Sequence, residues 1–96
     1  MIALTAILKA KSSRETELER VLKGLAEKVR ANEPRCHLYQ LCHSKHDPQT
    51  YLMIERYEDE DALDSHSNAD YFKAAFPDLM ECCEGPPQVA MFVEVD

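Results

Sequence analysis

The sequence has no tryptophan, only two glycines and five prolines, and no apolar run long enough for a membrane helix. So few glycines and prolines exclude a collagen-like or low-complexity chain. The apolar segment 1–10 already contains Lys9 and is too short to span a bilayer. It has neither a basic leader nor a small-residue cleavage site, so we expect no targeting segment and no membrane partner.

Basic side chains are also scarce, because 11 lysines and arginines stand against 18 aspartates and glutamates, for a formal net charge of -7. Such a chain repels the phosphates that a nucleic-acid-binding protein must neutralise. We therefore expect neither DNA nor RNA as a partner. With 45% apolar residues among 96, the chain has enough material for one core, and we predict a single domain over residues 1–96.

The four cysteines are placed unfavourably for disulfide bonds. Cys36 and Cys42 belong to one predicted strand and are separated by roughly 20 Å at strand rise, whereas a disulfide needs Cα atoms within about 7 Å. Cys82 and Cys83 are adjacent, and adjacent cysteines rarely bond to each other. We predict free thiols and a cytoplasmic protein, because thiols stay reduced in that compartment.

Apolar periodicity predicts four strands, at residues 2–11, 36–44, 50–57 and 89–95. A first helix should begin with a capping box formed by Ser12 and Glu15 and end at Asn32 and Pro34. Its apolar stripe consists of Leu18, Val21, Leu22, Leu25 and Val29. The polar segment 45–49 between the second and third strands predicts a hairpin.

A second helical region should begin at the cap residue Asp59 and be capped again at Ser67 or Asn68. Pro77 should break or kink it after Phe76. The resulting order β-α-β-β-α-β predicts an α+β, ferredoxin-like fold, with helices on one face of a four-stranded antiparallel sheet. Both faces of the first and last strands are apolar, so we predict a homodimer that covers the helix-free face.

A cluster of cysteines and histidines surrounds the predicted hairpin, and its composition is typical of zinc sites. The cluster consists of Cys36, His37, Cys42, His43 and His46. Only Cys42 or His43 can converge with His46 at the turn, which leaves too few ligands, so we expect no metal. The simpler interpretation puts Cys36 and Cys42 on one face of a strand and His37 and His43 on the other.

Glu55 lies in the middle of an apolar strand, where an unpaired carboxylate is costly. It shares a strand face with Tyr51, Met53 and Tyr57, while Arg56 points to the opposite face. Two interpretations remain open. Glu55 is either a structural carboxylate bonded to backbone or tyrosine, or a buried acid with a raised pKa that can accept a proton.

His66 lies at the break between the two helical pieces, where its imidazole can face the space between helix and sheet. It is the best candidate for a general base, although a histidine at a helix end is often a cap or a surface residue. Tyr71, Phe72 and Phe76 follow at helical spacing. We expect these residues mainly to fill the core and secondarily to line a pocket. Their rings would suit a flat ligand.

The segment 51–66, followed by Tyr71-Phe72-Lys73, closely resembles the signature of the antibiotic biosynthesis monooxygenase (ABM) superfamily. In that signature an apolar strand ends in Glu-x-aromatic, and acidic residues, Ala-Leu and a histidine follow before the next helix. The resemblance implies a dimeric α/β-barrel protein. It also implies a monooxygenase that needs no flavin, haem or metal and uses O2 to oxidise small aromatics such as quinols and anthrones.

Within this resemblance His66 matches the signature histidine, as the base or substrate-positioning group, and Glu55 matches the signature carboxylate. The pocket is expected between the second helical region and the sheet, with His66 at its edge. The expected substrate-binding residues are Tyr51, Met53, Tyr71, Phe72 and Phe76. Haem degradation is disfavoured, because Phe76 stands where haem-degrading members have a ligating histidine. The alternative is a dimeric small-molecule binding or stress-response protein without oxygen chemistry.

Overall fold

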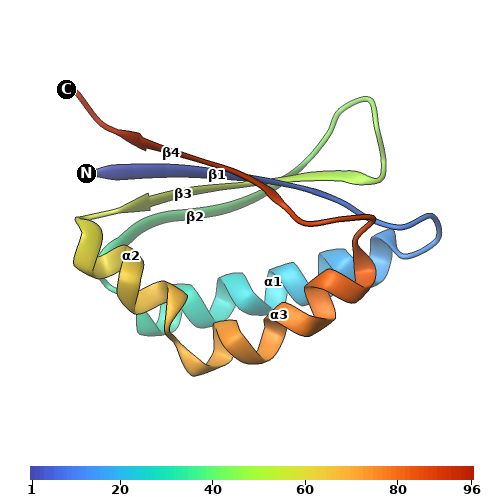
Figure 1. Ribbon diagram of the computed structural model, residues 1–96, viewed down its shortest axis with the longest axis horizontal. Helices are drawn as coiled ribbons and strands as arrows, with labels where there is room; N and C mark the ends of the chain where they lie inside the picture. Colours follow the sequence, from blue (N-terminus) through green and yellow to red (C-terminus); the bar gives the residue numbers. More distant parts are fainter.

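The computed structural model describes residues 1–96 as a four-stranded antiparallel sheet with all helices on one face (Figure 1). The strands, in the order β2-β3-β1-β4 across the sheet, are β1 (Ile2–Lys9), β2 (Cys36–His43), β3 (Thr50–Tyr57) and β4 (Gln88–Val93). The helices are α1 (Glu15–Asn32), α2 (Glu60–Ser67) and α3 (Asp70–Cys82). The predicted α+β, ferredoxin-like arrangement is confirmed; β3 has the predicted bounds, and the other three strands end one or two residues earlier than predicted.

The two central strands, β3 and β1, align side chains that line the candidate site. In β3 every second residue, from Tyr51 to Tyr57, is buried on the helix-covered face. The sheet register then places helix-side residues in rows across the strands. One row contains Tyr39, Glu55, Leu4 and Met91, and the next contains Leu41, Met53, Ala6 and Val89.

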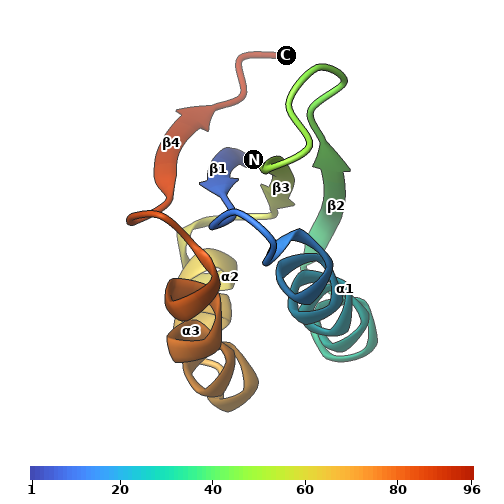
Figure 2. The same ribbon diagram turned by 90° about the vertical axis from the view of Figure 1, so that its right-hand side faces the viewer.

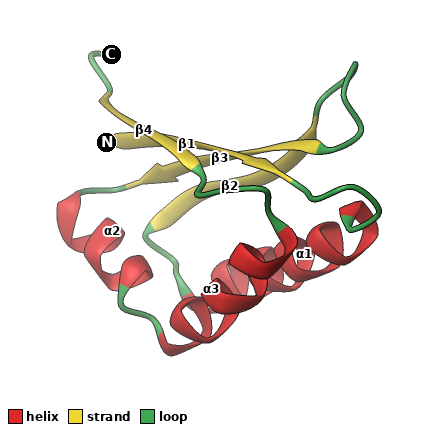
Figure 3. Cartoon of the chain, turned by 45° about the vertical axis from the view of Figure 1, so that its right-hand side comes forward, coloured by secondary structure: helices red, strands yellow, loops and turns green.

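Helix α1 packs its apolar stripe against the sheet, and the structure separates into a strand layer and a helix layer (Figure 3). Its buried residues are Leu18, Leu22, Leu25, Ala26 and Val29, while Val21 of the predicted stripe is only half-buried. The predicted capping box at Ser12 is wrong. The chain turns at Ser13, where φ is 72°, so the amide of Ser13 rather than that of Ser12 donates to the Glu15 carboxylate, at 2.9 Å.

The second helical region consists of two helices, as its pattern predicted, but their junction differs in detail. The predicted cap Asp59 is confirmed, since its carboxylate accepts from the amide of Ala62 at 2.9 Å. Neither Ser67 nor Asn68 caps α3, which begins after Ala69 without a side-chain cap. Asn68 instead ends α2, because its side-chain amide donates back to the Asp64 carbonyl.

The helix α3 continues through Pro77 to Cys82, so of the two predicted effects of Pro77, a break or a kink, the break after Phe76 is wrong. A proline inside a helix removes one backbone hydrogen bond. Here the helix beyond the proline is held by burial of Leu79 and Cys82 in the core beside α1. Tertiary packing of an apolar face stabilises a helix more than local propensity does, and it offsets the lost bond.

A β-bulge at the start of β2 changes which face its side chains occupy. Cys36 pairs with Tyr57 and Leu38 pairs with Arg56, with the register shifting between them. Cys36 therefore packs toward the helices, whereas Cys42, in register with Leu52, lies on the other face. The prediction that both cysteines share one face is wrong, because the extra residue of a bulge reverses the alternation. All four cysteines are free thiols, as predicted.

The helix-free face of the sheet carries several exposed hydrophobic side chains. Ile7 of β1, Leu38 of β2 and Phe92 of β4 are 41%, 37% and 57% exposed. The whole of β4 is exposed, and it lies at the edge of the sheet (Figure 2). Several exposed hydrophobic side chains on one face of a sheet favour an interaction surface there. None of the helices combines the length and the hydropathy needed to cross a membrane.

Candidate functional site

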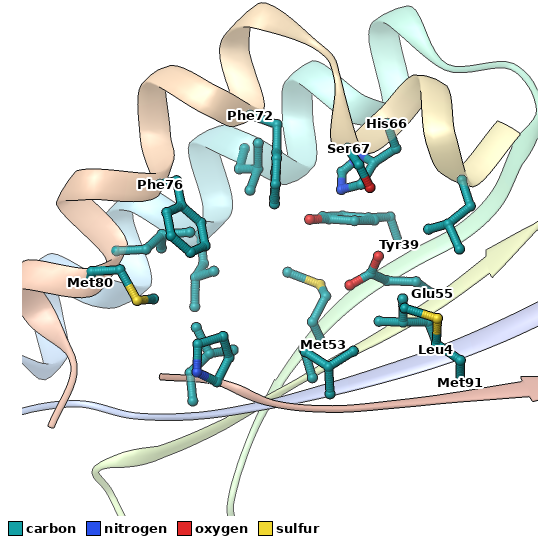
Figure 4. Close-up of a pocket in the computed structure, with 18 residues that line it drawn as sticks. Leu4, Tyr39, Met53, Glu55, His66, Ser67, Phe72, Phe76, Met80 and Met91 are labelled. Carbon is teal, nitrogen blue, oxygen red and sulfur yellow. The ribbon is translucent and has the colours of Figure 1, made fainter. Parts of the chain in front are cut away.

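A cavity of about 200 Å³ lies between the sheet and the helix layer (Figure 4). Its floor is formed by the two rows of the sheet that contain Glu55 and Met53. Its roof is formed by Phe72, Phe76 and neighbouring side chains of α1 and α3. Since 14 of its 18 lining residues are hydrophobic, the few polar groups must decide the chemistry.

His66 is buried in the wall of this cavity, in the last turn of α2. It points inward because it lies on the same face of α2 as Ala62 and Leu63, the other buried residues of that helix. Its ring is flanked by the rings of Tyr39, Tyr57 and Phe72, with centroid distances of 5.3, 5.5 and 4.7 Å. The imidazole therefore lies in an aromatic cage and has only a small exposed surface.

The carboxylate of Glu33 binds this imidazole from outside the cavity. Nδ1 of His66 lies 3.0 Å from Oε2 and 3.2 Å from Oε1 of Glu33. The hydroxyl of Tyr71 donates a hydrogen bond to the same Oε2. Glu33 directly follows the last residue of α1, so three separate helices contribute to one partly buried polar cluster.

Glu55 provides the second ionisable group of the cavity, from the middle of β3. Its side chain is buried, and the hydroxyl of Tyr57 donates to its Oε1. Burial raises the pKa of Glu55 to about 7, against the opposing effect of the Tyr57 hydrogen bond, and the charge of Glu33 adds to the rise. The structure is compatible with both interpretations of Glu55. Its hydrogen bond to a tyrosine fits a structural carboxylate, and its place in the cavity wall fits a buried acid that exchanges a proton.

Tyr39 separates the two groups. It is in register with Glu55, and its ring lies between the Glu55 carboxyl group and the His66 imidazole (Figure 4). Burial raises the pKa of its phenol, and the nearby Glu55 adds to this effect. Tyr39 therefore stays neutral and can act only as a hydrogen-bonding phenol.

Five of the seven predicted site residues line the cavity, and two do not. His66, Glu55, Met53, Phe72 and Phe76 are part of its wall.

The positions of Tyr51 and Tyr71 correct the prediction. Tyr51 lies under the start of α1, where its hydroxyl donates to Glu19 at 3.2 Å. Tyr71 precedes Phe72 by one residue, which is about 100° around a helix, so it points to Glu33 while Phe72 faces the cavity.

Glu33 and Tyr39 were not identified from the sequence. Glu33 has one local signal, because a carboxylate at the carboxyl end of a helix opposes the helix dipole and needs a compensating partner. Tyr39 has none, since its place beside Glu55 depends on the bulge in β2. The structure contains no group of three or more His, Cys, Asp or Glu side chains arranged to hold a metal ion.

Comparison with known proteins identifies the class to which this fold and site belong. Residues 1–78 match the family described as antibiotic biosynthesis monooxygenase, and the chain belongs to that family. Among curated proteins, none matches the chain. The family and the similar structures support a general monooxygenase-like role.

Several crystal structures share the whole fold. A candidate antibiotic biosynthesis monooxygenase from Caulobacter crescentus is 39% identical, with a TM-score of 0.94 over 99% of this chain and 90% of that one. Another crystal structure of an antibiotic biosynthesis monooxygenase is 26% identical, with a TM-score of 0.92 and full coverage of both chains. The protein PA3566 from Pseudomonas aeruginosa is 27% identical, with a TM-score of 0.87 over 99% and 94%.

Proposed function

We propose that the protein is a cofactor-independent monooxygenase that oxidises a small quinol- or anthrone-like aromatic with O2. The observation that carries this proposal is a buried imidazole, His66, in the wall of an otherwise apolar cavity. Histidine titrates near neutral pH and can take a proton from a phenol or an activated carbon. An apolar cavity suits the radical and peroxide species that follow.

The cavity has a polar and an apolar end, which gives the substrate one orientation. His66 and Glu55, with the Tyr39 ring between them, lie at the end near α2, whereas Met80 and Phe76 lie at the far end (Figure 4). The ionisable oxygen or activated carbon of the substrate would lie against His66, and the ring would extend toward Phe76. A cavity of about 150 Å³ is known to take benzene. The 200 Å³ here therefore favours one-ring or two-ring quinols over three-ring anthrones.

The proposed reaction needs no electron donor other than the substrate. His66 removes a proton, and the resulting anion passes one electron to O2 to give a substrate radical and superoxide. These combine through a new C–O bond, and protonation gives a hydroperoxide. The hydrogen that remains on that carbon then leaves as a proton while the O–O bond breaks and the carbonyl forms, and the departing hydroxide takes up a proton and leaves as water. The substrate loses two hydrogens and gains one oxygen atom, while the second oxygen leaves in water.

Glu55 is proposed as the proton donor to the peroxide. With a pKa raised to about 7, a substantial fraction of its carboxyl groups is protonated at neutral pH. An ordinary glutamate would be fully ionised and could not donate a proton there. Glu55 and His66 thus form the kind of acid and base pair that proton transfers in both directions require.

Oxygen uptake tests the proposal. We expect the purified protein to consume O2 with reduced naphthoquinols or benzoquinols, more slowly with anthrones, and to keep this activity after treatment with a chelator. Mass spectrometry after reaction in labelled O2 should find one labelled oxygen atom in the product. If quinones bind in the cavity but no O2 is consumed with any of these compounds, the protein is instead the small-molecule binding protein of the alternative hypothesis.

We also propose that the protein is a homodimer joined through the helix-free face of the sheet, and that it works in the cytoplasm, which its free thiols favour. The exposed Ile7, Leu38 and Phe92 on that face support the dimer. Ile54 lies at the centre of the same face, half-buried and in register with Thr5.

Replacing Ile54 by aspartate should place a charge inside this interface and release monomers, because an unpaired buried charge is costly. Light scattering at micromolar concentration should give a dimer mass for the wild type and a monomer mass for Ile54→Asp. Thr16→Asp, on the exposed side of α1, is the control and should stay dimeric. A wild-type protein of monomer mass would refute the dimer.

A further inference from the structure

Glu33 occupies a position that is energetically unfavourable for a carboxylate. It caps the carboxyl end of α1, where the helix dipole repels negative charge, and its side chain is only 11% exposed. No lysine or arginine is bonded to it. Its side-chain partners are the imidazole of His66 and the hydroxyl of Tyr71. Hydrogen bonds to those two groups alone therefore offset the energetic cost of this placement.

The geometry around Glu33 selects one form of the histidine. An ionised carboxylate only accepts hydrogen bonds, so the Nδ1 atom that contacts both of its oxygens must carry a proton. In the neutral imidazole the lone pair then lies on Nε2. The hydroxyl of Tyr71 donates to the same oxygen that lies nearest to Nδ1, which fixes the carboxylate in place.

The other ring nitrogen is free to react. Nε2 of His66 has no hydrogen-bond partner in the protein, yet no fully buried side-chain nitrogen or oxygen in the structure lacks one. Nε2 must therefore retain accessible surface, and the cavity that His66 lines provides it. The flanking rings of Tyr39, Tyr57 and Phe72 hold the imidazole by packing, but none of them is hydrogen-bonded to it.

We propose that Glu33, held by Tyr71, is a positioning residue that keeps the proton of His66 on Nδ1 and presents the lone pair of Nε2 to the substrate. This inference rests on the proposed function, since it makes His66 competent as the base of that reaction. Glu33 does not touch the substrate. It acts through His66, in the way that a carboxylate orients a histidine base in other enzymes.

Two variants test this assignment. Glu33→Gln keeps the size of the side chain, but its amide group can donate to Nδ1 and so favours the opposite tautomer, with the proton on Nε2. A carboxylate that orients a metal-bound histidine accounts for about 10- to 100-fold in affinity or activity. We expect a loss of the same order in kcat, with KM within about twofold. Tyr71→Phe removes one hydrogen bond and should cost about fivefold.

Two further variants serve as controls, and NMR measures the tautomer of His66 directly. Glu27→Gln, an exposed position on α1, should leave kcat and the tautomer unchanged. Glu33→Asp keeps the carboxylate and should restore part of the activity lost in Glu33→Gln. Nitrogen-15 NMR of the histidine ring should find Nδ1 protonated and Nε2 unprotonated in the wild type near pH 8, and the tautomers mixed or reversed in Glu33→Gln. Wild-type protein with the proton on Nε2 would overturn the proposal.

The NMR measurement needs no substrate, so this inference and the proposed function can fail separately. If oxygen uptake depends on His66 but is unchanged in Glu33→Gln and Tyr71→Phe, the positioning role is refuted and the monooxygenase remains. If no aromatic supports oxygen uptake, the monooxygenase is refuted. In that case a tautomer that changes in Glu33→Gln would still establish that Glu33 controls His66.

Discussion

Replacing His66 by alanine should lower oxygen uptake with a quinol by roughly 10²–10⁴, the usual contribution of a positioned general base. The expected loss is large because no other group in the cavity replaces the imidazole. Tyr39 is held neutral by its raised pKa, and Glu55, which is only partly ionised at neutral pH, is separated from the His66 side of the cavity by the Tyr39 ring (Figure 4). The substrate would keep its proton, and transfer of an electron to O2 would become slow.

The alanine variant also leaves the buried carboxylate of Glu33 without its histidine, so a loss of stability has to be separated from a loss of chemistry. His66→Gln makes this separation, since its amide can still donate to Glu33 but is not a base. We expect it to fold, as judged by circular dichroism and thermal unfolding, and to be as inactive as His66→Ala. His46→Ala, exposed in the hairpin, should keep full activity. A folded His66→Gln protein with normal turnover would show that His66 is not the base.

The second large effect concerns stability. The folded state binds the proton of Glu55 up to a pKa of about 7, whereas the unfolded chain releases it near the ordinary value of 4.5. Between these values the folded state binds more protons, so the free energy of unfolding falls as pH rises. This contribution is complete below pH 4.5 and is lost as pH rises through 7. The shift corresponds to about 3 kcal/mol in total.

Replacing Glu55 by glutamine should remove most of this pH dependence, because an amide does not ionise and can still accept from the Tyr57 hydroxyl. Urea unfolding at several pH values between 5 and 8 measures it. From pH 5 to pH 8 we expect the free energy of unfolding of the variant to rise by up to about 3 kcal/mol relative to that of the wild type. Glu27→Gln removes an exposed carboxylate and should leave the slope unchanged. Parallel pH profiles for wild type and Glu55→Gln would mean that Glu55 ionises normally.

Local patterns were sufficient wherever a residue's environment depends on its nearest neighbours along the chain. Alternation in β3 predicts that Glu55 and Met53 are buried on one face, and the structure has them there. The periodicity of α1 predicts its buried stripe, and Asp59 has the residue type of a cap. The interruption after His66 predicts two helical pieces, and these are α2 and α3. Each of these features follows from the 2.0 or 3.6 residue repeat or from the first turn of a helix.

Features that depend on contacts between distant segments were decided by the tertiary structure. The bulge in β2 reverses the face of Cys42 and brings Tyr39 beside Glu55, and α3 continues through Pro77 because its far end is buried. Glu33 lies 33 positions before His66, and no local repeat relates the two residues. The sequence by itself determined the order of elements, the buried carboxyl group and the position of the candidate histidine. Only the packing of α1 beside α2 and α3 decided that a carboxylate and a tyrosine would hold that histidine, because hydrogen-bond partners are selected by proximity in space.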